Sequence, residues 1–250
     1  MTAPVPRPPV RRVVSLVPSL TESVAATASG LLVGATDWCT HPAGLDVARI
    51  GGTKNPDTEA IAGLRPDLVV ANEEENREPD LAALRAAGMR VLVTRVRTLP
   101  EAFAELERLL VGACGLPRPA WLDAARAAWQ RPPVPRGPRR RAVVPIWRRP
   151  WMALGRDTFA GDLLARLGVD HVLAAAAERY PRFDPRRLPE AADLVVLPDE
   201  PYRFTAEDGP EAFPGLPAAL VDGRSLTWYG PSLGDAAGVL SRQLDAARSC

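Results

Sequence analysis

Aromatic and charged side chains recur in this chain directly after the apolar runs that are typical of buried strands. Trp and Tyr are adjacent in SLTWYGPSLGD (225–235), although only 6% of the residues are aromatic. Rings in such positions can pack on a flat ligand by apolar contact with little loss of side-chain entropy. Carboxylates and guanidinium groups beside them can recognise polar substituents. The positions predicted to contact ligand are Trp38, Glu73, Glu74, Glu75, Arg148, Tyr202, Trp228 and Tyr229.

Some of these positions have simpler interpretations. The run Glu73–Glu75 could equally be the acidic N-terminus of a helix, where the helix dipole favours negative charge. Trp147 and Trp151 also follow a predicted strand and are further candidates for the ligand wall. Trp121 and Trp129 are two helical turns apart, which favours packing in a core or between lobes.

Residues able to carry catalysis or hold a metal are few. The chain has two histidines, His41 and His171, and it lacks GxxxxGK[ST], GxGxxG and zinc-ligand spacings. His171 lies in an apolar stretch and is predicted to be structural, whereas a ligand-facing role for His41 stays open. We therefore predict no catalytic residue, no metal ligand and no enzymatic activity.

Composition narrows the class of protein. The 250 residues are 46% hydrophobic, enough to bury a core, and the formal net charge is +1. Such a balance provides no global field for nucleic acid, so no nucleic-acid partner is expected. The first residues contain no apolar signal-peptide core, and no run reaches the ~18 apolar residues of a membrane span. As written, the chain is expected in the cytoplasm, or in the periplasm or outside the cell if the true start lies upstream.

Strand and helix patterns alternate in the first part of the chain. Ser19 and Glu22 have the spacing of a capping box, which predicts a helix that begins at Ser19. Further helices are predicted at 58–64 and 74–88. Strands alternating with helices favour a parallel sheet covered by helices. The predicted strands are VVSLVP (13–18), LLVGAT (31–36), DLVVA (67–71) and VLVT (91–94).

Helices are predicted at 99–115 and 120–130 in the middle of the chain, followed by a connector rich in Pro and Arg. The alternation then restarts with a strand predicted at 142–147. The fold class is predicted to be α/β, with two Rossmann-like lobes bridged by a helix and a ligand cleft between the lobes. Ligands of open α/β sheets bind beyond the carboxyl ends of the strands. The predicted parts are an N-terminal lobe (10–98), a helical bridge with its connector (99–141), and a C-terminal lobe with a closing helix (142–250).

The chain resembles the cobalamin/iron-siderophore (class III, helical-backbone) periplasmic binding proteins, most strongly the cobalamin-binding proteins of ABC importers. The resemblance extends from about residue 10 to residue 248. It implies a non-catalytic receptor that holds a corrinoid or another metal chelate between two lobes with little hinge motion. Its segments are VVSLVPSLTE (13–22), VGATDWCTHP (33–42), IGGTKNPDTEAI (50–61), RPDLVVANEEENRE (65–78), IWRRPWMALGRDTFAGDLL (146–164), VLPDEPYRF (196–204) and VDGRSLTWYGP (221–231).

The resemblance also implies roles for single residues. The family's two corrinoid-contacting aromatics fall on Trp38 and Trp228, and a carboxylate that docks to the permease falls on Glu59. The second docking carboxylate falls near Arg186-Arg187, where the reversed charge would repel a basic permease surface. No intrinsic cofactor is expected, and the ligand that the resemblance implies is cobalamin or another corrinoid.

Two alternatives stay open at this point. One is a siderophore or haem receptor within the same binding class. The other is a cytoplasmic tetrapyrrole carrier or enzyme that is not coupled to a permease. In either case the partner is a small-molecule chelate and the protein is expected to be a monomer.

Overall fold

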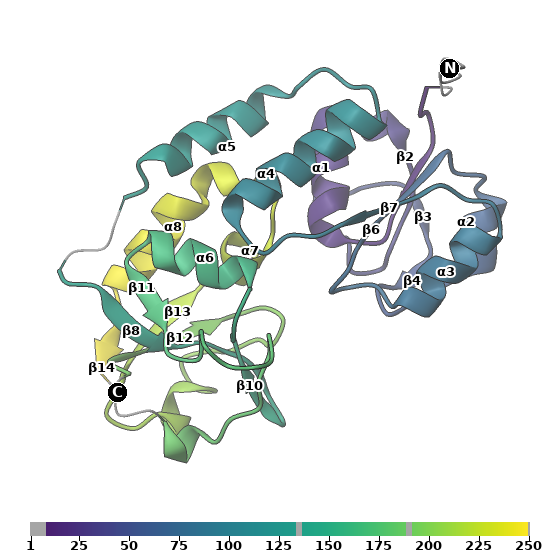
Figure 1. Ribbon diagram of the computed structural model, residues 1–250. Helices are drawn as coiled ribbons and strands as arrows, with labels where there is room; N and C mark the ends of the chain where they lie inside the picture. Colours follow the sequence, from purple (N-terminus) through teal and green to yellow (C-terminus); the bar gives the residue numbers. More distant parts are fainter. Residues whose placement is uncertain (1–8, 134–136, 189–191, 250) are drawn as a thin grey trace. The chain divides into compact units, whose positions relative to one another are not determined.

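The computed structural model describes residues 9–133, 137–188 and 192–249. The chain forms two compact units (Figure 1). Unit 1 comprises Met1–Arg95 and Phe103–Ala120, and unit 2 comprises Val96–Ala102 and Trp121–Cys250. The segment predicted as a separate bridge (99–141) is thus shared by the two units. Among the described residues, no helix has both the length and the apolar character needed to cross a bilayer.

Unit 1 is built on a five-stranded parallel sheet with the strand order β3-β2-β1-β6-β7. Every residue of the two central strands, β1 and β6, is buried, as expected for a parallel sheet. The strands are β1 (Val13–Ser15), β2 (Leu32–Ala35), β3 (Ala48–Arg49), β6 (Leu68–Asn72) and β7 (Val91–Thr94). The helices are α1 (Pro18–Ala28), the 3₁₀ turn η1 (Ser29–Leu31), α2 (Thr58–Gly63) and α3 (Glu78–Ala86).

The capping box predicted at the start of α1 is wrong. The helix begins at Pro18, and Val17 is its N-cap without a side-chain hydrogen bond. The reason is that the fixed φ of proline suits the first helical position, where a missing N–H costs nothing. Ser19 therefore lies inside the helix, and its hydroxyl is buried without a hydrogen-bond partner.

The helical middle segment begins in unit 2, continues in unit 1 from Phe103 to Ala120, and returns to unit 2 at Trp121. Helix α4 (Leu99–Glu107) continues as a π-helical segment, η2 (Arg108–Ala113). Helix α5 (Ala120–Gln130) follows and covers the predicted range without change. The indole N–H of Trp129 donates to the carbonyl of Leu233 at 2.9 Å, which confirms the predicted core packing of this ring.

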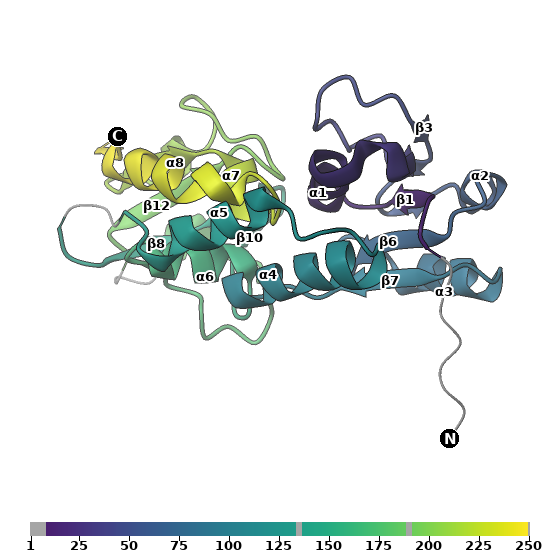
Figure 2. The same cartoon turned by 90° about the horizontal axis from the view of Figure 1, so that it is seen from above.

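Unit 2 contains a second five-stranded sheet with the order β11-β8-β12-β13-β14. The last strand is antiparallel and the others are parallel. The strands are β8 (Arg140–Val143), β11 (Val169–His171), β12 (Leu194–Pro198), β13 (Pro217–Val221) and β14 (Arg248–Ser249). The helices are α6 (Phe159–Arg166), α7 (Gly223–Thr227) and α8 (Leu233–Asp245), with short 3₁₀ turns η3 (Pro185–Arg187) and η4 (Pro210–Ala212). Helix α7 leads into α8 (Figure 2). Helix α8 packs beside β13.

The strand predicted at 142–147 is divided in two. The second part, β9 (Pro145–Arg148), leaves the main sheet and pairs with β10 (Trp151–Ala153) as an antiparallel hairpin. Proline at residue 145 has no N–H to continue the ladder of the sheet. The prediction of α/β architecture with a parallel sheet in each of two parts is confirmed.

An aromatic cluster fills one side of the unit 2 core. Trp151 is stacked on Phe204 at 5.9 Å between ring centroids and meets Phe213 edge-on at 5.4 Å. These rings pack with Val195 and Leu197 of β12. Trp151 therefore packs in the core, although its position after a strand had made it a candidate for the ligand wall.

Candidate functional site

The strand order of unit 1 places its switch point between β1 and β6. The chain leaves β1 towards β2 and leaves β6 towards β7, so the two connections diverge at the carboxyl edge of the sheet. Open α/β sheets bind ligands at such a point. The segment Glu73–Glu75 directly follows β6 and therefore lies at this edge.

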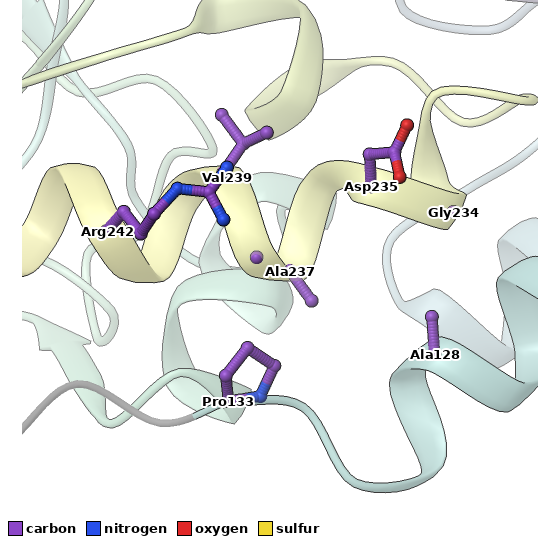
Figure 3. A pocket seen from close by; sticks show the side chains of 8 residues that line it. Ala128, Pro133, Gly234, Asp235, Ala237, Val239 and Arg242 are labelled. Atoms are coloured by element: carbon purple, nitrogen blue, oxygen red, sulfur yellow. The ribbon is translucent and has the colours of Figure 1, made fainter.

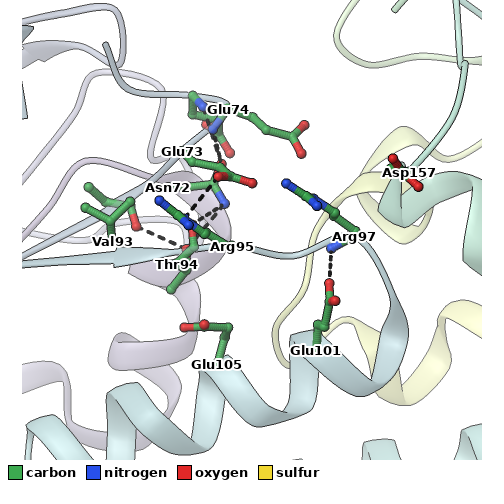
Figure 4. A network of polar contacts seen from close by, with 12 residues as sticks. Asn72, Glu73, Glu74, Val93, Thr94, Arg95, Arg97, Glu101, Glu105 and Asp157 are labelled. Atoms are coloured by element: carbon green, nitrogen blue, oxygen red, sulfur yellow. Dashed lines mark hydrogen bonds and ion pairs between the residues drawn. The ribbon is translucent and has the colours of Figure 1, made fainter. Parts of the chain in front are cut away.

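Two buried asparagines hold this segment in a tight turn, and Figure 4 shows one of them, Asn72, beside Glu73, Glu74 and Thr94. The side-chain oxygen of Asn72 accepts the N–H groups of Glu74 at 2.8 Å and Glu75 at 3.3 Å, and its amide nitrogen donates to Thr94 at 3.3 Å. The side-chain oxygen of Asn76 accepts the N–H of Asn72 at 2.9 Å. Both asparagines are 4% exposed. The helix predicted at 74–88 consequently begins later, at Glu78.

A short hairpin rests on the same turn. It consists of β4 (Gly51–Gly52) and β5 (Asn55–Pro56), and its connecting residues are Thr53 and Lys54. The side chain of Asn76 donates to the carbonyl of Thr53 at 2.9 Å, and Lys54 donates to the carbonyl of Glu74. Lys54 is the single lysine among the 31 basic residues, which distinguishes this position in the sequence.

Trp38 offers an open aromatic surface in unit 1. It follows β2 and is 67% exposed. Its indole nitrogen lies beside the hairpin, because a Cβ atom added to Gly52 would meet it at 3.5 Å. Trp38 thus has the exposure that a stacking role requires, and its ligand contact stays a prediction.

The charge at this edge is predominantly acidic. Three carboxylates, those of Glu73, Glu74 and Glu75, lie here, and the cations that contact this run include Arg95 and Lys54. Arg95 forms an ion pair with Glu73 at 3.2 Å, and Lys54 is bound to a main-chain carbonyl. Carboxylate oxygens have several acceptor sites, so this edge suits a ligand that donates hydrogen bonds. The predicted ligand contacts of the three glutamates are compatible with this geometry and stay predictions.

In unit 2 the switch point lies between β8 and β12. The chain passes from β8 to β11 on one side and from β12 to β13 on the other. Hairpin β9–β10 extends from the carboxyl end of β8, and Tyr202 follows the carboxyl end of β12. Trp147, Arg148 and Tyr202 therefore share this edge of the unit 2 sheet.

Arg148 is held by carboxylates of its own unit. It forms ion pairs with Asp208 and Glu211, and its guanidinium carbon lies 5.3 Å above the ring of Trp151. Burial pushes the pKa of Glu211 upward, but hydrogen bonds from the N–H of Gly209 and from Arg148 outweigh it and lower the pKa. The guanidinium thus organises the loop that carries these acids, and the predicted ligand contact of Arg148 stays a prediction.

Tyr202 joins the same network. Its hydroxyl donates to Asp208 at 2.7 Å, and its ring contacts Phe204 with 4.7 Å between centroids. The ring of Trp147 meets Tyr202 edge-on at 5.7 Å. Trp147 is 42% exposed, whereas Tyr202 is half-buried.

Trp228 and Tyr229, both predicted to contact ligand, are buried. Trp228 is 9% exposed, donates its indole N–H to Glu200 at 2.9 Å and has the Arg224 guanidinium over its ring at 5.6 Å. Tyr229 is 5% exposed and meets Phe159 edge-on at 5.9 Å. The cause is helix α7, which was not predicted; it ends at Thr227, and Trp228 is its C-cap. Ligand contacts of these two rings stay predictions and would involve only their small exposed parts.

The residues connected with permease docking are exposed. Glu59 lies in the first turn of α2, next to the N-cap Asp57. Arg186 and Arg187 lie in η3, where the Asp184 side chain accepts the N–H of Arg186 at 3.0 Å. Unit 1 therefore has an exposed negative charge at Glu59, and unit 2 has exposed positive charges at Arg186 and Arg187. The docking role of Glu59 stays a prediction.

His171 and the two buried cysteines, Cys39 and Cys114, have local structural surroundings. A ring nitrogen of His171 lies 2.8 Å from the carbonyl of Gly155, which confirms a structural histidine. Burial raises the pKa of the Cys39 thiol, and it raises that of Cys114 to about 11. In the described part of the chain, no group of three or more His, Cys, Asp or Glu side chains could hold a metal ion.

Unit 2 has a groove between helices α5 and α8. It has a volume of about 530 Å³ and is formed by α5, α8 and the residues after α5 (Figure 3). Small and aliphatic side chains make up most of its wall, so it offers few groups for recognition. The lining residues are Ala128, Pro133, Gly234, Asp235, Ala237, Gly238, Val239 and Arg242.

The chain is similar in sequence to the vitamin B12-binding protein of Vibrio cholerae. The two are 31% identical over 103 residues, which are 40% of this chain and 37% of that protein. The matched region therefore spans little more than a third of the curated relative's length. No family model matches the chain.

Similarity to solved structures covers nearly the whole chain. The periplasmic vitamin B12-binding protein BtuF of Vibrio cholerae has a TM-score of 0.70 at 18% identity, covering 94% of this chain and 97% of that one. The periplasmic haem-binding protein RhuT from Roseiflexus sp. RS-1 has a TM-score of 0.73 at 24% identity, covering 94% and 98%. The chain thus has the two-lobed periplasmic binding protein fold.

Proposed function

We propose that this chain is a non-catalytic substrate-binding protein that holds a corrinoid, or a closely related metal chelate, for uptake by an ABC importer. The observation that carries the proposal is the 31% identity to a vitamin B12-binding protein over 103 residues. The fold supports a binding role, because solved proteins with this fold are described as binding vitamin B12 or haem.

The chemistry at the edge of unit 1 favours a corrinoid among these ligands. A corrin ring carries several amide side chains, which donate hydrogen bonds, whereas haem carries two carboxylates. The acidic run Glu73–Glu75 accepts hydrogen bonds from amides and repels carboxylates. The exposed ring of Trp38 adds an apolar surface for a flat macrocycle.

Haem is the second candidate. The observation in its favour is the similarity to RhuT, at 24% identity over 94% of this chain. Haem would place its two carboxylates near cationic side chains of the protein. The two candidates therefore predict opposite responses to the removal of carboxylates at residues 73–75.

The uptake role implies a compartment and a partner. The similar solved proteins are described as periplasmic. We propose the same compartment and an ABC permease partner, with Glu59 as a docking carboxylate. Exposed Arg186 and Arg187 supply the opposite charge on unit 2, so the permease surface that meets unit 2 would have to be acidic.

The test is an equilibrium titration followed by tryptophan fluorescence. Cyanocobalamin, dicyanocobinamide, haemin and a ferric hydroxamate would be added to the wild type, to Trp38→Ala and to Val111→Ala. Val111 is also an exposed apolar residue of unit 1, so it serves as the matched control. We expect saturable corrinoid binding that weakens about tenfold, or ~1.4 kcal/mol, in Trp38→Ala and is unchanged in the control.

The opposite results would remove the proposal. Wild-type protein that binds no corrinoid at micromolar concentration excludes the corrinoid. If haemin binds instead, and binds more tightly after Glu74→Gln, the haem candidate replaces it.

A further inference from the structure

We infer that Trp147, with Arg149 beside it, is the ligand-contacting ring of unit 2 and forms a site for a flat conjugated macrocycle that carries an acidic substituent. The inference rests on the proposed function and names a different aromatic residue from the one that the family resemblance implies. It follows from position, exposure, fixed geometry and charge.

The first step is position. Hairpin β9–β10 extends from the carboxyl end of β8, which borders the switch point of the unit 2 sheet. Tyr202 follows β12 on the other side of that point and contacts Trp147. Trp147 therefore stands where an open α/β sheet receives its ligand.

The second step is exposure. Among the described residues the large hydrophobic side chains that are exposed are Trp38, Val111, Trp147 and Leu220. Trp147 is 42% exposed, against 9% for Trp228. Contact between an exposed indole ring and water is unfavourable, and a ligand that covers the ring with apolar surface removes this unfavourable contact. Trp147 can therefore gain more from covering by a ligand than the buried ring.

The third step is fixed geometry. The indole N–H of Trp147 donates to the carbonyl of Arg149 at 3.2 Å, which sets the direction of the ring. The edge-on contact with Tyr202, at 79° between ring planes, occupies at most one face of the indole. Tyr202 is itself held by Asp208. A ring held in this way loses little entropy when a ligand stacks on its open face.

The fourth step is charge. Arg148 is neutralised by Asp208 and Glu211, whereas Arg149 is exposed and forms no ion pair in the part of the chain that the structure describes. A guanidinium group binds phosphate or carboxylate through paired hydrogen bonds. The site therefore fits a macrocycle with an acidic group. The phosphodiester of the nucleotide arm in cobalamin is such a group, and cobinamide lacks it.

The experiment compares cyanocobalamin with dicyanocobinamide on four variants. Trp147→Ala removes the ring, Trp147→Phe keeps an aromatic face, Arg149→Gln removes the charge, and Leu220→Ala is the control on an exposed apolar residue of the same unit. Circular dichroism and urea unfolding would show that each variant is folded.

We expect Trp147→Ala to raise the Kd of both corrinoids about tenfold, with partial recovery in Trp147→Phe and no change in Leu220→Ala. Arg149→Gln should raise the Kd of cyanocobalamin and leave that of dicyanocobinamide unchanged. Unchanged binding in Trp147→Ala, while Trp38→Ala weakens binding, would overturn this inference and leave the proposed function in place. An equal loss for both corrinoids in Arg149→Gln would overturn the assignment of the acidic group. Absence of corrinoid binding in the wild type would instead overturn the proposed function.

Discussion

The side chain of Asn76 is expected to contribute more to the stability of unit 1 than any of the exposed side chains near it. Its side chain donates to the carbonyls of Leu16 at 3.3 Å and Thr53 at 2.9 Å, and it accepts the N–H of Asn72 at 2.9 Å. Asn76→Ala removes all three hydrogen bonds from a residue that is 4% exposed. A hydrogen bond contributes about 0.5–1.5 kcal/mol net, and a buried group left without a partner costs more, so we expect a loss of about 3 kcal/mol.

The measurement is urea unfolding followed by circular dichroism, with hydrogen exchange of the amides in the turn. Asn55→Ala is the matched control, because Asn55 is exposed at the hairpin and should change the free energy of unfolding by no more than about 0.5 kcal/mol. The amides of Glu74 and Glu75 should exchange faster in Asn76→Ala, since Asn72 would no longer be held. A loss below about 1 kcal/mol would refute the idea that these three hydrogen bonds hold the turn.

Three further predictions concern unit 2 and the thiols. The pKa of Glu211 is lowered in the folded protein, so the folded protein binds fewer protons than the unfolded chain as the pH falls below about 4.5, and it loses stability there. Glu211→Gln removes this contribution and should make the loss of stability in acid shallower. Urea midpoints measured from pH 3 to pH 6 would test this. Cys39 and Cys114 are buried and have raised pKa values, and Cys250→Ser leaves them as the two thiols of the chain. The native variant should react slowly with a thiol reagent at pH 8 and rapidly in urea. Fast labelling of the native variant would contradict the burial of these thiols. Trp129→Phe should lower the free energy of unfolding by about 1–2 kcal/mol through its lost hydrogen bond to a main-chain carbonyl, and an unchanged urea midpoint would show that this bond is dispensable.

Elements whose sequence pattern is local were predicted well. Strand β7 and helix α5 occupy the ranges predicted for them, because a β-branched run and an amphipathic run each specify their structure without distant partners. Helix α7 was missed because it has only five residues, too few to show a helical period. Its N-cap Asp222, whose side chain accepts the N–H of Ser225 at 2.7 Å, was the signal that could have found it.

Exposure of the aromatic residues could not be predicted from position along a strand. Trp228 is covered by partners that include Glu200, 28 residues earlier, and Trp151 packs with Phe204 and Phe213. Such coverage depends on contacts between distant segments, which no local pattern specifies. The strand pattern placed Arg148 at the correct edge of the unit 2 sheet. It did not reveal the two carboxylates that hold Arg148, because they too come from a distant segment.

The asparagine pair at the edge of unit 1 left a detectable signal. Asn72 and Asn76 enclose the acidic run, and asparagine side chains favour turns by hydrogen bonding to nearby backbone groups. This pattern favours a turn over the start of a helix at residue 74. The contact to Leu16, by contrast, is formed across 60 residues and required the structure.

The division of the chain bears on the order in which the protein can fold during synthesis. The backbone passes from one unit to the other after Arg95, after Ala102 and after Ala120. Unit 1 therefore cannot be completed on the ribosome until residues up to Ala120 have emerged. The short stretch Val96–Ala102, made early, has to wait for the rest of unit 2. For the same reason, no single cut in the gene separates the two units cleanly, because a cut after Ala120 leaves Val96–Ala102 of unit 2 attached to unit 1. An exchange of ligand-binding halves between related proteins would have to join the chain at all three crossings.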